Sequence, residues 1–67
     1  MQQLVMHLPT SSHELWARAL ATELLLGSSA ADWAAARAAE LHGSGDEVGA
    51  RELRGVQTRL EQLAGLR

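Results

Sequence analysis

Apolar residues recur at helical spacing along most of this chain, and residues typical of helix termini bound each recurring stretch. A serine precedes each stretch, with an acidic residue three positions later, so that the two side chains can cap free backbone N–H groups. A glycine follows each stretch, where a left-handed residue often ends a helix. We therefore predict helices at about 12–26, 30–42 and 46–64. The serine–acid pairs are Ser11 with Glu14, Ser29 with Asp32 and Ser44 with Glu47, and the glycines are Gly27, Gly43 and Gly65.

The links between the predicted helices are short, so consecutive helices should turn back on each other. The predicted fold class is all-α: a small antiparallel three-helix bundle at 11–67, preceded by an apolar arm at 1–10. The arm contains Leu4 and Met6 and is too apolar for a solvated tail. It is either an ordered arm, such as an extended segment or a strand paired with a second copy, or a loosely packed terminus.

The first predicted helix has more apolar surface than one neighbouring helix can cover. At about 100° per residue, its apolar side chains form two lobes, with Leu25 pointing away from both. A monomeric bundle would leave Leu25 in water, whereas a dimer could cover it. One lobe holds Trp16, Leu20 and Leu24, and the other holds Leu15, Ala19 and Leu26.

The third predicted helix has a narrow apolar seam with the 4-3-4-3 spacing of a coiled coil. The seam either packs on the first two helices or meets a second copy. Together with the arm and the end of the first helix, it provides the candidate interaction residues. The seam residues are Gly49, Leu53, Val56, Leu60 and Leu63, and the candidate interaction residues are Leu4, Met6, Leu25, Leu26, Leu53 and Leu60.

Two pairs of residues in the first two helices should define the core. Trp16 and Trp33 are the only aromatic residues, and we expect both in the core, because each can bury a large area; an exposed one would mark a partner surface. Glu23 and Arg37 each interrupt an apolar arc, and a buried charge needs a partner. We predict a partly buried ion pair between them, the alternative being that both side chains reach outward at the edge of the arc and never meet.

Composition limits how so short a chain can be stabilised. It has 67 residues, a net charge of −2 and no cysteine, so disulfides, thiolate metal sites and cysteine nucleophiles are excluded. Its three histidines are far apart and lack metal-ligand spacing. A second subunit is therefore the expected source of additional stability. We expect no catalytic, metal-binding or cofactor-binding residues.

No segment predicts membrane insertion or export. The leucine run at residues 24–26 is far too short for a bilayer, and the N-terminus lacks the basic and apolar regions of a signal peptide. We therefore expect a cytoplasmic protein that does not bind membranes.

These observations favour a non-enzymatic protein–protein interaction module that self-associates as a homo-oligomer. It could also bind an unidentified larger protein as an adaptor or inhibitor, as small mobile-element or phage proteins do. The alternative is a DNA-binding helix-turn-helix regulator, since two short helices follow each other across a glycine-containing turn. The second of these helices has one basic residue, Arg37, besides Asp32 and Glu40, so we do not expect nucleic-acid binding.

The motif residues also resemble a family of short uncharacterised helical proteins from sphingomonad-type alphaproteobacteria. The resemblance covers about residues 13–63 and departs at Leu53, where the family pattern has a tryptophan. It implies a compact helical domain from a bacterium and no particular function. The matching residues are Glu14-Leu15-Trp16-Ala17, Leu20, Gly27, Trp33, Gly45-Asp46-Glu47, Gly49 and Arg59-Leu60-Glu61-Gln62-Leu63.

Overall fold

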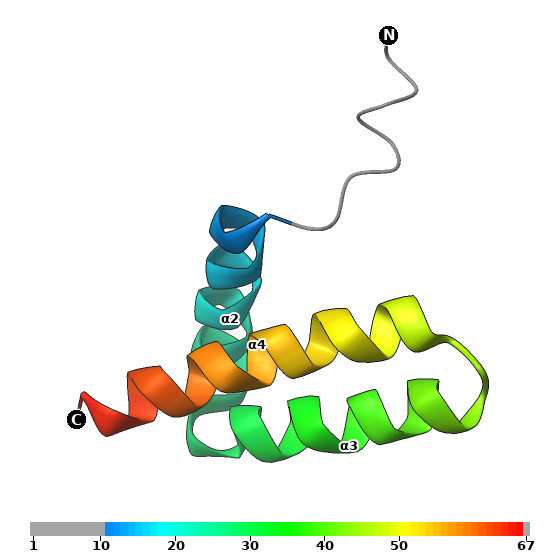
Figure 1. Cartoon of the computed structure of the whole chain (residues 1–67). Helices are drawn as coiled ribbons and strands as arrows, with labels where there is room; N and C mark the ends of the chain where they lie inside the picture. Colours follow the sequence, from blue (N-terminus) through cyan, green and yellow to red (C-terminus); the bar gives the residue numbers. More distant parts are fainter. Residues whose placement is uncertain (1–10, 67) are drawn as a thin grey trace, which may run out of the picture.

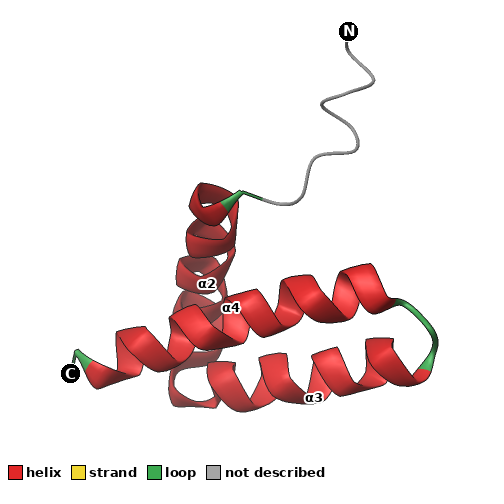
Figure 2. Cartoon of the chain, viewed as in Figure 1, coloured by secondary structure: helices red, strands yellow, loops and turns green. Residues whose placement is uncertain are grey.

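The computed structural model describes residues 11–66, and every regular element in this range is helical (Figure 2). The all-α prediction is confirmed, and each helix lies within one residue of its predicted bounds. The predicted arm at 1–10, with Leu4 and Met6, lies outside the described residues. The elements are helix α2 (Ser12–Leu26), the 3₁₀ turn η1 (Gly27–Ser29), helix α3 (Ala30–Gly43) and helix α4 (Glu47–Gly65).

The helices do not form the antiparallel three-helix bundle that the sequence predicted. Helices α3 and α4 run side by side in opposite directions, and their contact is the most extensive in the molecule (Figure 1). Helix α2 stands across this pair and contacts α4, with little contact to α3. The chain therefore turns a corner at the short α2–α3 link. Helix α2 crosses a hairpin that α3 and α4 form together.

Helix α2 begins at the cap that the sequence predicted. The Ser11 hydroxyl accepts from the backbone N–H of Glu14 at 3.1 Å, and the Glu14 carboxylate accepts from the backbone N–H of Ser11 at 3.2 Å. This reciprocal pair satisfies two N–H groups that the helix cannot. Such a cap is worth about 1 kcal/mol, so the start of α2 is fixed by local chemistry.

Ser29 is the N-cap residue of α3, as predicted, but the predicted capping bond is absent because the chain hardly leaves helical geometry between α2 and α3. Ser29 has φ −87° and ψ −5° and makes no capping hydrogen bond through its side chain. Gly27 makes the corner instead, with φ 58° and ψ −131°, a conformation that side-chain-bearing residues rarely adopt. The change of direction between α2 and α3 therefore depends on the backbone of Gly27, the first residue of η1.

The predicted N-cap of α4, Ser44, is wrong, because the cap lies two residues later. Asp46 is the N-cap of α4, and its carboxylate accepts from the backbone N–H of Gly49 at 2.9 Å. Gly45 precedes it with φ 90°, which turns the chain sharply enough to bring α4 back along α3. The Ser44 hydroxyl donates instead to the carbonyl of Leu41 at 3.0 Å.

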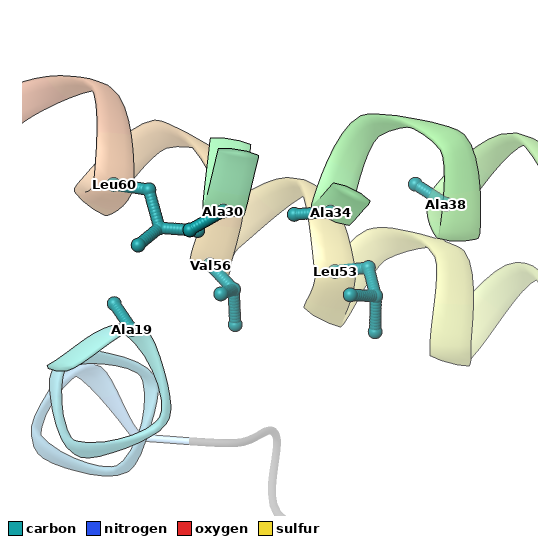
Figure 3. Close-up of a cluster of buried hydrophobic side chains, with 7 residues drawn as sticks. All are labelled: Ala19, Ala30, Ala34, Ala38, Leu53, Val56 and Leu60. Carbon is teal, nitrogen blue, oxygen red and sulfur yellow. The ribbon is translucent and has the colours of Figure 1, made fainter. Parts of the chain in front are cut away.

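Small side chains form most of the core. Three alanines spaced four apart on α3 face α4, so that the two backbones can approach closely, and Ala19 is the one buried residue of α2 (Figure 3). Val56 is the largest side chain that is fully buried. The buried cluster consists of Ala19, Ala30, Ala34, Ala38, Leu53, Val56 and Leu60.

Candidate protein-interaction surface

The inner face of α2 meets α4 at a glycine. A Cβ atom built on Gly55 would lie 3.0 Å from Leu15 Cδ1, which is closer than ordinary van der Waals contact. The absence of a side chain at Gly55 therefore lets Leu15 approach the α4 backbone, and Ala19 packs into the core one turn later. The lobe of α2 that contains Leu15 and Ala19 is thus the one that faces the core, although Leu26 at its end stays partly exposed.

Arg59 fastens the two helices together beside this contact. Its guanidinium donates to the Gly55 carbonyl at 2.9 Å and to the Ser12 hydroxyl at 3.1 Å, and Cζ lies 5.6 Å from the centre of the Trp16 ring. Sequence reasoning missed this role, although an arginine one turn after a mid-helix glycine was a visible clue. A second polar contact between the helices is the exposed pair of Arg18 and Glu52, at 3.5 Å.

The other lobe of α2 faces solvent. Leu20, Leu24 and Leu25 are 49%, 89% and 83% exposed, and we call these three residues the outer leucines. The sequence predicted that Leu25 would be uncovered in a monomer, and it is. It did not predict the exposure of Leu20 and Leu24.

The surroundings of the outer leucines are apolar as well. Ala17 and Ala21 are exposed on the same side of the helix, and the stretch 19–26 contains one charged residue, Glu23, which is half-buried. The exposed side of a surface helix is ordinarily charged or polar. The small side chains of Ala17 and Ala21 between large leucines form a surface on which another helix can pack closely.

Neither tryptophan is a buried core residue. Trp33 on α3 is 45% exposed, and Trp16 is half-buried beneath Arg59. The prediction of two core tryptophans is therefore wrong. The α3 face that meets α4 is filled by alanines, and the close approach they allow leaves no room there for an indole ring.

The predicted buried ion pair between Glu23 and Arg37 is also wrong. The Arg37 side chain is half-exposed and pairs with Glu40 of its own helix at 3.1 Å, and no charged residue is buried among those described. Helix α2 crosses the hairpin instead of lying beside α3. The side chains that interrupt the two apolar arcs, Glu23 and Arg37, therefore do not face each other.

The apolar seam of α4 packs inside the chain. Leu53 and Leu60 are buried in the core cluster, and Leu63 is packed against it. Of the two interpretations that the sequence left open, packing on the other helices is the one observed. Leu53 and Leu60 are therefore not available as interaction residues, whereas Leu25 and Leu26 are still accessible candidates.

The α2–α3 corner has the outline of a helix-turn-helix but not its charge. Among the exposed residues of α3 are the acidic residues Asp32 and Glu40, and its one arginine, Arg37, is paired with Glu40. A DNA-recognition helix needs side chains that donate hydrogen bonds to phosphates and to the edges of bases. No feature of this corner adds support to the DNA-binding alternative.

Searches for known features and relatives gave no match. Across residues 11–66, no three His, Asp or Glu side chains gather as metal ligands. No helix in that range has the length and apolar character needed to cross a bilayer. Neither a protein-family model, nor a curated protein, nor a solved structure matches the chain. The resemblance to the bacterial family stays a prediction.

Proposed function

We propose that this chain is a small non-enzymatic protein-interaction module that self-associates through the outer leucines of α2. The observation that carries the proposal is the exposure of Leu24 and Leu25, at 89% and 83%, in a chain whose core consists mainly of alanine. A domain this small needs its large apolar side chains for stability, so leaving them in water sacrifices burial unless another polypeptide covers them.

A second copy of the chain fits this surface better than a charged partner does. The exposed side chains of α2 between residues 20 and 26 carry no charge, so two copies can face each other there without repulsion between like charges. A two-fold axis would place each outer leucine opposite the same patch of the other copy, which makes a closed dimer.

Sedimentation velocity over a wide concentration range tests the proposal. The wild-type chain should change from monomer to dimer as its concentration rises, and Leu24→Glu should stay monomeric because each interface would bring two carboxylates together without partners. Val48→Glu is the matched control, since Val48 is 65% exposed but lies in the first turn of α4, away from α2. A wild-type chain that stays monomeric throughout, or a dimer that both variants weaken equally, would contradict the proposal.

A further inference from the structure

We infer that two copies join by exchanging α2, which opens about Gly27 and packs on α4 of the other copy. This inference rests on the proposed self-association and specifies its geometry. Three features of the structure support it: the backbone at Gly27, the register of apolar residues through the corner, and the limited contact between α2 and the hairpin.

The corner between α2 and α3 depends on the backbone conformation of one residue. The helical hydrogen bonds of α2 continue to the N–H of Gly27, which donates to the Glu23 carbonyl, and Ala30 is again helical, with φ −62° and ψ −45°. Leu26 and Ser29 also lie in the right-handed helical region. A rotation at Gly27 to helical dihedral angles would therefore join α2 and α3 into one helix spanning residues 12–43.

The spacing of small and apolar residues across the corner fits such a continuous helix. Seven positions through the corner follow a 4-3-4-3-4-3 spacing, which places them in one stripe. In the bent chain, the first two of these residues are exposed leucines, whereas two of the alanines beyond the corner are buried against α4. Straightening the chain would turn Leu20 and Leu24 to the side that α4 occupies. The seven positions are Leu20, Leu24, Gly27, Ala31, Ala34, Ala38 and Leu41.

The α4 seam has matching spacing and runs past the corner. Helix α4 has 19 residues against 14 in α3, so its last turns extend beyond the start of α3 (Figure 1). In an open chain, Leu63 would lie near the position of Gly27, and the exposed Leu66 would follow towards Leu24. Opening thus covers apolar surface that the bent chain leaves in water.

Opening breaks few contacts, and a second copy can restore all of them. Ala19 is the one buried residue of α2, and its contacts with α4 include Leu15 against Gly55, Arg59 with Ser12 and Trp16, and Arg18 with Glu52. When α2 of one chain lies on α4 of another, each of these contacts forms again between chains. The exchanged dimer therefore keeps the native contacts and, in addition, turns Leu20 and Leu24 towards the end of α4.

Cysteines placed on separate chains test the exchange directly, because the natural chain has none. Chains with Leu15→Cys are mixed with size-tagged chains carrying Gly55→Cys and treated with a short bifunctional thiol crosslinker at high concentration. Exchange brings the two positions together between chains and should give a covalent heterodimer. The control replaces Gly55→Cys by Gly43→Cys, a position with open space around it at the far end of α3.

Gly27→Ala gives an independent test. A Cβ at Gly27 would meet nothing within 4 Å, so the substitution acts through the backbone, where φ 58° is strained for alanine and helical angles are not. It should strengthen dimerisation about tenfold or more, equivalent to about 1.4 kcal/mol, whereas Gly43→Ala should leave the dimer constant unchanged. An unaltered dimer constant in a folded Gly27→Ala chain would count against exchange; if the variant fails to fold, the cysteine mixture decides.

The outcomes separate the inference from the function on which it rests. A dimer in sedimentation that gives no heterodimer crosslink above the control would overturn exchange and leave self-association through rigid surfaces. Absence of any dimer would overturn both. A heterodimer crosslink that increases with concentration and exceeds the control would support both.

Discussion

The hairpin of α3 and α4 and the crossing helix α2 use the same kinds of residue in opposite ways. Helix α3 buries three alanines against α4, whereas α2 buries one alanine and exposes four leucines. The α3 side of the hairpin contact is thus made of small side chains, whereas most of the leucines of α2 point outward. The difference shows that the hairpin holds the fold together, and that α2 carries the surface available to a partner.

The largest effect expected from this contrast comes from truncating the same residue type in the two regions. Leu60→Ala removes a side chain that is 3% exposed and should lower the free energy of unfolding by ~2–5 kcal/mol. Leu24→Ala removes one that is 89% exposed and should change it by less than ~0.5 kcal/mol in dilute solution. Urea titrations of both variants measure the difference. Equal losses would mean that α2 is packed as tightly as α4.

A side chain at the glycine beneath α2 should separate the two regions. Gly55→Leu would force Leu15 away from α4, an overpacking effect of about 1–3 kcal/mol against the docking of α2, while improving the helix propensity of α4 by about 1 kcal/mol. We expect the NMR signals of α2 to change and those of the α3–α4 turn to persist. Gly43→Leu is the control, because nothing lies within 4 Å of a Cβ there. If Gly55→Leu changed the NMR signals of all three helices equally, α2 and the α3–α4 hairpin would not be separate regions.

The guanidinium that bridges the helices should have a smaller effect. Arg59→Met keeps much of the apolar stem but loses the bond to Ser12 and the contact with Trp16, which should reduce stability by ~1–2 kcal/mol. Tryptophan fluorescence should report the loss, since Trp16 lies under the guanidinium. Arg54→Met, an exposed position on the same helix, should have little effect. If both variants lost stability equally, Arg59 would not be fastening α2.

The smallest effect concerns the start of α2. Ser11→Ala removes the hydroxyl that caps Glu14 and should lower thermal stability by the equivalent of about 1 kcal/mol. Ser29→Ala is a matched control at the start of α3, where the side chain makes no capping bond, and should have an effect within ~0.5 kcal/mol. A larger loss from Ser29→Ala would show that α3 needs a cap that the structure does not give it.

The sequence predicted the helices well because their signals are local. The periodic apolar residues, the cap at Ser11 and the glycine at position 27 act within a few residues of themselves. One cap was misplaced, because Asp46 lies closer to the start of α4 than Ser44 does. The capping bond expected at Ser29 is absent because the chain there is already helical.

The arrangement of the helices could not be predicted, because it depends on which of two similar lobes of α2 faces α4. The lobe with Leu20 and Leu24 is as apolar as the lobe with Leu15 and Ala19. The glycine at position 55 and the arginine one turn later decide between them, and both act across 40 or more residues. Of the leucines of α2 that are exposed, the sequence selected only Leu25 and Leu26 as candidate interaction residues, since the exposure of the others depended on that choice.

Native-state hydrogen exchange, followed residue by residue at low and high protein concentration, tests the account most directly. In dilute solution, the amides of α2 should exchange well before those of the α3–α4 hairpin, because α2 buries only Ala19 and can unfold without unfolding the pair. At high concentration, the protection of α2 should rise as a second copy holds it. Equal protection in all three helices that does not change with concentration would contradict the account.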